Sequence, residues 1–88
     1  MDQLVLVQLR NTDGTVVKVT EVRTRPHRTF DRLMRKVCQG MGCSLAGYDV
    51  VSGGVVLNDC ALEMRTFGIP AGRCLLVDLR PKWIDSCF

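Results

Sequence analysis

Thiols and one imidazole are the side chains of this sequence with the widest catalytic and metal-binding chemistry. The chain has five cysteines and one histidine. They are Cys38, Cys43, Cys60, Cys74, Cys87 and His27. Metal and redox sites usually place such residues in close pairs, as in Cys-x-x-Cys or His-x-x-x-His, and neither spacing occurs here. His27 lies in an arginine-rich stretch with no nucleophile and carboxylate beside it. The sequence therefore predicts no enzyme activity, no metal site and no cofactor.

The cysteines also indicate the redox environment. Their number is odd and their spacing is not that of a disulfide framework, so reduced thiols are expected. Cys38 and Cys74 fall in apolar stripes and are predicted to be small buried hydrophobic residues. No apolar run approaches the ~20 residues of a membrane-spanning helix. Asp2 and Gln3 stand where a secretory signal carries positive charge. We therefore expect an intracellular protein, cytoplasmic or nuclear, with no membrane partner.

Cationic side chains are the second group with functional potential. The chain of 88 residues carries a formal net charge of +3. Much of the positive charge gathers between residues 18 and 36. The predicted basic face consists of Lys18, Arg23, Arg25, Arg28, Arg32, Arg35 and Lys36. Such a face either docks on an acidic protein surface or serves as a solvated exterior that keeps the domain soluble. Nucleic acid is a poor fit because Phe30, the one aromatic residue in the cluster, follows the core periodicity.

Two strands are predicted before this cluster. Residues 4–9 are almost continuously apolar, and Val5, Val7 and Leu9 share the parity assigned to the core. Asn-Thr-Asp-Gly at residues 11–14 has the composition of a hairpin turn. Residues 15–22 then return antiparallel, and the alternation predicts that Val17 and Val19 face inward.

A helix is the best-supported element of the sequence. Thr29 is its predicted N-cap, and apolar residues recur from Phe30 to Met41 at helical spacing. Gly40 and Gly42 are stop signals. The opposite face carries Arg32, Arg35 and Lys36, so the helix presents cations to solvent.

The rest of the chain predicts short strands and turns. Residues 48–51 and 55–57 are apolar and flank a Ser-Gly-Gly turn. Residues 58–66 are expected to be a turn with one helical turn inside. A last strand covers residues 74–79. The order ββαββ predicts an α+β roll in which one main helix packs on one face of a mixed sheet. Residues 1–80 form the expected domain and residues 81–88 a C-terminal tail.

This order resembles the ubiquitin-like, or β-grasp, superfamily over about residues 4–80. The sequences VLND at residues 56–59 and FGIPAGRCLLVDLR at residues 67–80 carry the resemblance. The family's conjugated members end in Gly-Gly soon after the last strand. Arg-Pro-Lys-Trp follows here, so the resemblance implies a domain that is not conjugated.

Ubiquitin-like domains also bind partners through an apolar patch on the exposed face of the sheet. The corresponding candidates here are Leu4, Leu6, Val50 and Leu76. Asp78 replaces an apolar residue of the family's patch, which makes ordinary ubiquitin receptors doubtful partners. The alternative is that Trp83 or Phe88 from the tail covers these side chains.

A shorter stretch resembles the Ras-binding domains of Raf-type kinases, which share this fold. It comprises residues 15–19 and 31–36. In that family the second strand is an open edge that pairs with a small GTPase, and basic residues meet its acidic switch region. Small ubiquitin-like modifiers similarly bind extended, acid-flanked peptides between this strand and the helix. Filament-forming β-grasp domains imply a third option, self-association against an acidic face. That face would contain Asp49, Asp59, Glu63 and Asp78.

We therefore expect a non-catalytic module that binds another protein with an acidic or apolar surface, as the N-terminal domain of a larger adaptor or scaffold. The alternatives are a GTPase-binding domain and a self-assembling domain. A fold does not by itself fix a function, so the structure of the surfaces has to decide.

Overall fold

The structure, a computed structural model, describes residues 2–82. Its elements follow the predicted order, with a short 3-10 helix added before the third strand, and the helical turn predicted within residues 58–66 is found as a 3-10 helix at residues 64–67. They are β1 (Gln3–Arg10), β2 (Val16–Thr24), α1 (Phe30–Met41), η1 (Leu45–Gly47), β3 (Tyr48–Ser52), β4 (Val55–Val56), η2 (Met64–Phe67) and β5 (Cys74–Pro81).

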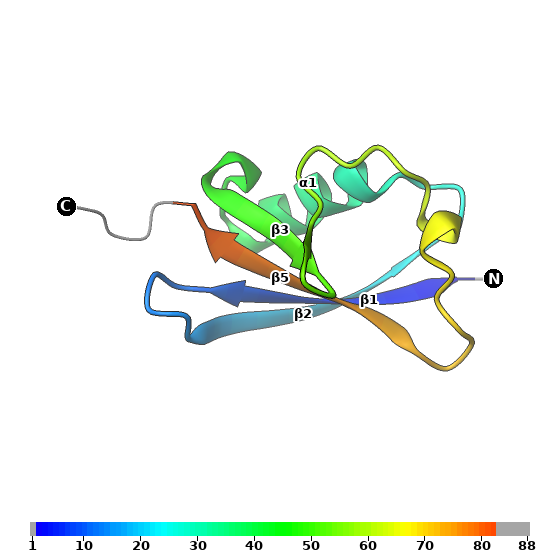
Figure 1. Ribbon diagram of the computed structural model, residues 1–88, viewed down its shortest axis with the longest axis horizontal. Helices are drawn as coiled ribbons and strands as arrows, with labels where there is room; N and C mark the ends of the chain where they lie inside the picture. The colour runs from blue at the N-terminus through cyan, green and yellow to red at the C-terminus, as the bar shows by residue number, and fades with distance from the viewer. Residues whose placement is uncertain (1, 83–88) are drawn as a thin grey trace.

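The strands form one five-stranded mixed sheet in the order β2-β1-β5-β3-β4. The first and last strands of the chain, β1 and β5, run parallel at its centre, and every other pair is antiparallel. Helix α1 lies along one face of this sheet (Figure 1). The predicted α+β roll is confirmed, and β2 and β4 are its two edges.

The hairpin between β1 and β2 follows the turn residues of the sequence. Gly14 has φ 88°, a left-handed conformation that glycine adopts without a steric penalty. The amide of Asn11 donates to the carbonyl of Thr15 at 3.0 Å, which closes the turn. The pairing register shifts between Leu9 and Arg10, so β2 contains one extra residue near its start.

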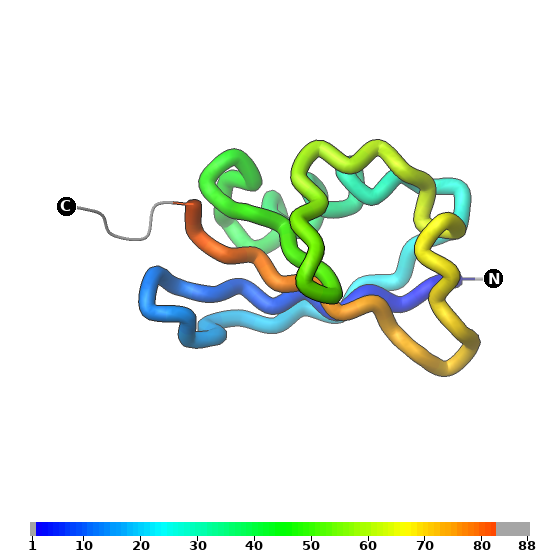
Figure 2. Tube along the Cα trace, viewed as in Figure 1, coloured from blue at the N-terminus to red at the C-terminus, as the bar shows by residue number. Residues whose placement is uncertain are grey.

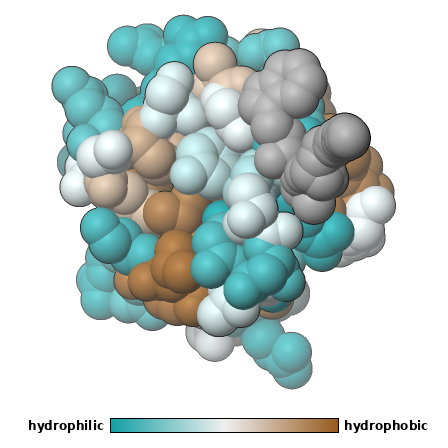
Figure 3. Space-filling view, turned by 90° about the vertical axis from the view of Figure 1, so that its left-hand side faces the viewer, coloured by the Kyte–Doolittle hydropathy of each residue, from teal (hydrophilic) through white to brown (hydrophobic). Residues whose placement is uncertain are grey.

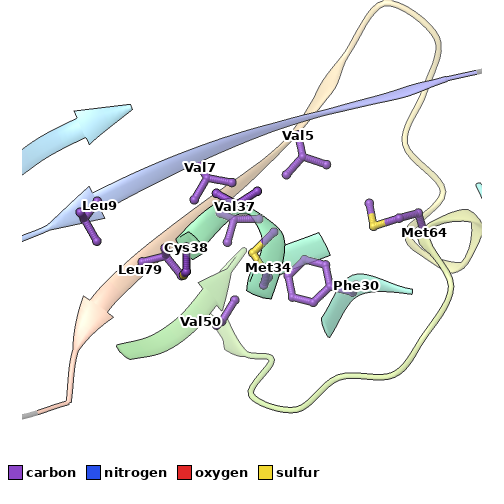
Figure 4. Close-up of a cluster of buried hydrophobic side chains, with 11 residues drawn as sticks. Val5, Val7, Leu9, Phe30, Met34, Val37, Cys38, Val50, Met64 and Leu79 are labelled. Carbon is purple, nitrogen blue, oxygen red and sulfur yellow. The ribbon is translucent and has the colours of Figure 1, made fainter. Parts of the chain in front are cut away.

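The core lies between the sheet and the apolar stripe of α1. Side chains from β1 and β5 meet those of the helix, and Met64 closes the cluster from η2 (Figure 4). The fully buried members include Val5, Val7, Phe30, Met34, Cys38, Met64, Val77 and Leu79. The Phe30 ring also packs against Phe67, with ring centroids 5.1 Å apart. Burial of this apolar area is the main source of the fold's stability.

Helix α1 begins where the sequence predicts but is capped in another way. Thr29 is the N-cap residue and makes no side-chain capping hydrogen bond. Instead, the amides of Phe30 and Asp31 donate to the carbonyls of Leu62 and Cys60 at 2.8 and 2.9 Å. Figure 2 shows this yellow-green stretch on the same side of the sheet as the helix. A segment distant in sequence therefore satisfies the first helical amides.

Two predicted orientations are wrong, and the strand register gives the reason. Val19 was expected in the core but is 52% exposed, because Thr20 and not Val19 lies opposite the buried Val7. Val50 was expected to face outward but is 3% exposed, because it lies opposite the buried Leu79. Directly paired residues share a face of the sheet, so both assignments reverse.

Val17 and Cys74 are also more exposed than the sequence predicts. Val17 is 55% exposed, next to the register shift at the start of β2. Cys74 is exposed at the first residue of β5, where the strand emerges from the turn before it. Cys38, by contrast, is buried as predicted.

Candidate functional site

A basic groove lies between the edge strand β2 and helix α1. Its volume is about 750 Å³. The cationic residues that line it, called the groove cations below, are Arg23, Arg25, Arg28, Arg32, Arg35 and Lys36. Six of the seven residues of the predicted basic face therefore share one surface hollow.

The core packing of α1 places half of these cations. Phe30, Met34, Val37 and Cys38 are buried against the sheet. Arg32, Arg35 and Lys36 lie at intervening helical positions and are exposed. The three cations project from the helix because their neighbours at helical spacing occupy the core.

The end of β2 and the loop after it supply the other groove cations. Arg23 is on the strand opposite Leu4, so it borders the groove from the outer face of the sheet, and Arg25 and Arg28 follow in the loop. This loop is tied to the first two residues of η2. The Met64 amide donates to the Arg28 carbonyl at 2.8 Å, and the Arg65 amide donates to the Pro26 carbonyl at 2.9 Å. The loop that carries these arginines is thus held at both of these points.

The positive charge of the groove is only partly offset by the nearby protein, through Asp31, which lies in the first turn of α1 and interacts with Arg35. Within residues 2–82 the salt bridges join Arg10 and Arg80 to Asp78 and Arg65 to Glu63, and none involves a groove cation. Asp2 is the one carboxylate residue among the lining residues. Since like charges held together repel, an anionic partner would be stabilised here.

The floor of the groove is apolar. Val22 from β2 and Leu33 and Val37 from α1 line it beneath the cations. Val37 is buried, and Val22 and Leu33 are half-buried. An apolar floor below a cationic rim suits a chain segment that carries both aliphatic and acidic side chains.

The wall of the groove on the sheet side is an open strand edge. β2 pairs with β1 on one side, and no strand of residues 2–82 pairs with its other side. Such an edge presents backbone amides and carbonyls at regular spacing and accepts an added strand.

Lys18 lies apart from the groove cations. It is opposite Leu9 in the hairpin, and its Nζ lies 3.4 Å from the carbonyl oxygen of Met41. That carbonyl belongs to the last residue of α1, where the helix dipole favours a cation. Lys18 therefore has a structural contact at the helix end.

The second candidate surface is the face of the sheet opposite α1. Leu4, Leu6 and Leu76 lie on it as predicted, with Leu4 opposite Cys74 and Leu6 opposite Leu76. Val50, also predicted for this face, points into the core instead. Its neighbour Val51 lies on the outer face, opposite Asp78. The strand register adds Val19, opposite Gln8, and Val56, opposite Val51. The sequence contains these valines, but only the strand pairing shows which way they face.

Asp78 limits this apolar surface. It is outward, as predicted, and forms salt bridges with Arg10 and Arg80. One half of the outer face is therefore apolar and the other is an ion-pair network. Viewed from the hairpin end, the molecule shows hydrophobic atoms in the lower middle, surrounded by hydrophilic ones (Figure 3).

The acidic residues proposed for self-association do not all lie together: Asp49, opposite Arg80, and Asp78, opposite Val51, share the outer face of the sheet, but Glu63 lies apart. Asp78 lies within the sheet, whereas Glu63 lies beside Thr29 at the start of α1 and is paired with Arg65. Asp49 accepts a hydrogen bond from the side chain of Asn58, and Asp59 is in the turn that follows. Self-association remains a prediction, without a continuous acidic face to support it.

Within residues 2–82 no three histidine, cysteine or acidic side chains are grouped to hold a metal ion. His27 is exposed in the loop after β2. No helix in this part of the chain is long and apolar enough to cross a membrane. The tail residues Trp83, Cys87 and Phe88, including the proposed cover over the sheet face, lie outside the described residues.

Comparison with known proteins identifies the fold but no relative by sequence. No protein-family model matches the chain, and no curated protein matches it. Solved structures do. A ubiquitin from Caldiarchaeum subterraneum has 15% identity and a TM-score of 0.69, over 91% of this chain and 95% of that one. The ubiquitin-like domain of yeast Ddi1 gives the same identity and TM-score, over 97% and 94% of the two chains. A computationally designed protein based on human erythrocytic ubiquitin has 23% identity and a TM-score of 0.67 over the whole of both chains.

Proposed function

Since the chain has the ubiquitin-like β-grasp fold, we propose that it is a non-catalytic module that binds another protein through the basic groove. Two structural neighbours are ubiquitin-like domains of named proteins, yeast Ddi1 and the 4931431F19Rik protein, and the latter domain is N-terminal. This supports an interaction domain of a larger adaptor or scaffold.

One observation carries the proposal. Six cations without salt bridges in residues 2–82 surround a groove whose wall is an unpaired strand edge. The partner that fits is an extended acidic segment. Its backbone would pair with β2 while its carboxylates face the cations of α1. Charge complementarity of this kind speeds encounter and fixes the orientation of the bound segment.

The spacing of the cations indicates the pattern of the partner. Arg32 and Lys36 are one helical turn apart, about 5–6 Å between their Cβ atoms. Alternate residues of an extended chain are separated by about 6.6 Å and point to the same side. Acidic residues at every second position would therefore meet successive groove cations. The apolar floor at Val22 and Leu33 favours an aliphatic residue among them.

The test is a titration of the full chain with a fluorescent peptide that carries Glu at every second position, except for one Val among these same-side positions, and Ser between them. The control peptide has Gln in place of Glu. Binding of the acidic peptide alone is expected, with Kd in the micromolar range. The double variant Arg32→Ala/Arg35→Ala should weaken it by at least about tenfold, since each lost charge-assisted contact costs about 1 kcal/mol or more.

A matched control separates this site from net charge. Arg73→Ala/Arg80→Ala removes the same charge at exposed positions that do not line the groove. The Kd of this control variant should stay within about twofold of the unsubstituted chain, because salt screens surface charges that lie away from the bound peptide. Equal losses in both double variants, or equal binding of the Glu and Gln peptides, would refute the groove as the site.

A small GTPase is the second candidate partner, and the position of β2 favours it. β2 is the edge strand, and Arg32, Arg35 and Lys36 project beside it. A GTPase with an acidic edge strand would extend the sheet across this edge. Titration with GTP-loaded and GDP-loaded protein distinguishes this candidate, because only a switch-dependent contact binds the GTP form more tightly.

A further inference from the structure

Two cysteines meet at the C-terminal end of α1. Gly42 ends the helix in a left-handed conformation, φ 76°. The Cys43 amide donates to the Cys38 carbonyl at 3.0 Å, and the Gly42 amide donates to the Gln39 carbonyl at 3.2 Å. This pair of hydrogen bonds defines a Schellman motif, in which the residues at the two ends commonly touch through their side chains. Here both of those residues are cysteines.

Their thiols are close in space. Cys43 packs against the buried cluster that contains Cys38, and burial, with the neighbouring Cys43 side chain, raises the pKa of Cys38. Cys38 is 1% exposed, within the core. Cys43 is half-buried and lines a shallow hollow at the hairpin end of the molecule, together with Val17, Tyr48 and Pro81. One thiol of the pair is thus reached from solvent and the other lies behind it.

The other described thiols are placed differently. The Cys60 carbonyl accepts from Asp31 in the first turn of α1, so Cys60 lies at the opposite end of the helix from Cys43. Cys74 is exposed at the start of β5. Asp31 and Cys38 are seven residues apart on the helix, and each residue adds about 1.5 Å along its axis, so Cys60 lies far from Cys38. Among residues 2–82, Cys43 is therefore the thiol adjacent to Cys38.

We propose that Cys38 and Cys43 form a reversible disulfide site whose oxidant is a small-molecule disulfide such as glutathione disulfide. The Cys43 thiolate attacks one sulfur of the oxidant, which breaks its S–S bond and releases one glutathione thiolate. The Cys38 thiol, which gives up its proton as it reacts, then attacks the Cys43 sulfur of this mixed disulfide and releases the second glutathione as a thiol. In total the protein loses two protons and two electrons and gains one S–S bond, while the oxidant becomes two thiols.

This inference is independent of the basic groove. The disulfide would link the last turn of the helix to the residue after Gly42, close to the contact between Lys18 and the Met41 carbonyl. It would therefore lock the helix end covalently where hydrogen bonds now hold it.

The test uses the full chain with Cys60→Ser, Cys74→Ser and Cys87→Ser, which leaves only the proposed pair. The protein is incubated with glutathione disulfide, quenched with N-ethylmaleimide and weighed by mass spectrometry. We expect a monomer two hydrogens lighter, free of both glutathione and maleimide, that dithiothreitol converts back.

Two further variants test the order of attack. Adding Cys38→Ala should stop the reaction at a stable glutathione adduct on Cys43. Adding Cys43→Ala should leave Cys38 unmodified, because it is buried. Circular dichroism checks that each variant is folded.

The unsubstituted chain provides a second route that does not depend on these variants. Cleavage before aspartate releases residues 31–48, which contain Cys38 and Cys43 but no other cysteine. An internal disulfide in this peptide supports the proposal. A persistent glutathione adduct on the two-thiol protein, a disulfide-linked dimer, or no reaction would overturn it.

Discussion

Asp78 lies between Arg10 and Arg80 on the face of the sheet opposite α1. Its Oδ1 is 3.4 Å from Arg10 Nε and its Oδ2 is 3.7 Å from Arg80 Nη2. The Asp78 side chain is only 16% exposed. One carboxylate thus links two arginines on the two central strands, and it does so where a fully apolar outer face would otherwise continue.

Asp78→Asn should lower the free energy of unfolding by about 0.5–1.5 kcal/mol. The amide keeps the shape but leaves two arginines without their counter-ion, in a partly shielded site. Urea denaturation measures the change. Glu63→Gln is the matched control, because the Glu63–Arg65 pair is much more exposed and should contribute almost nothing. Similar losses in the two variants would contradict the assigned role of Asp78.

Val50→Ala should destabilise the fold by about 2 kcal/mol, because it opens a cavity next to Leu79 in the core. Leu76→Ala removes a larger side chain from the outer face, where Leu76 is 49% exposed. Its cost should stay near 0.5 kcal/mol. Urea midpoints of the two variants give the comparison, and the reverse ranking would show that the strand register is wrong.

Val50 and Leu76 show which side-chain orientations the sequence determines and which it leaves open. In residues 74–79 the one charged residue, Asp78, marks the outward parity, so the sequence predicts the inward parity of Leu75, Val77 and Leu79 correctly. In β3 two valines are adjacent, and composition alone does not tell which one faces the core. The partner strand decides, since Val50 is opposite Leu79. In β2 the alternation of Val17 and Val19 with Lys18 and Thr20 predicts the wrong orientation, because the register with β1 places Val19 opposite Gln8 on the outer face.

Cys38→Ala should reduce the decrease in the free energy of unfolding that the chain shows as pH rises above about 9. Burial, with a smaller contribution from the Cys43 thiol, raises the pKa of Cys38 to about 12 from an ordinary value of 9.0. The folded state therefore favours the neutral thiol. Its contribution is complete below about pH 9 and is lost as pH rises toward 12, because the unfolded chain releases the proton first.

Urea denaturation at pH 8, 9 and 10 measures this effect. The unsubstituted chain should lose more stability over this range than the Cys38→Ala variant does. Cys74→Ala is the control, because Cys74 is exposed and its removal should leave the pH profile unchanged. Identical profiles for all three proteins would contradict the shift.

Asp59 is the one residue other than glycine with a positive φ in the described chain, 54°. Asp59→Gly should keep or raise the free energy of unfolding, by at most about 1 kcal/mol, because glycine adopts this conformation without strain. Asp59→Val should lower it by about 1–2 kcal/mol, since a β-branched side chain is strongly disfavoured there. Thermal unfolding of the pair checks the sign, and a valine variant as stable as the glycine variant would argue against the turn geometry.

The basic groove was predictable in composition but not in shape. Helical spacing places Arg32, Arg35 and Lys36 on the solvent side of α1 without any structure. That the end of β2 and its loop turn toward the same hollow depends on the ties from Pro26 and Arg28 to the first two residues of η2, which are backbone contacts between distant residues. Lys18 has the same charge but reaches the helix end, because the hairpin register sets its direction.

The parallel pairing of β1 with β5 makes the centre of the sheet the last part of the domain to be completed during synthesis, because β1 is made first and β5 last. Leu4 pairs beside Cys74 and Leu9 beside Leu79, so the two strands are joined across nearly the whole sequence. Until residue 79 has left the ribosome, β1 has one open edge and β3 lacks its neighbour. The nascent hairpin and helix must therefore wait with their apolar faces uncovered, which predicts slow, late closure and a chain prone to aggregate when truncated.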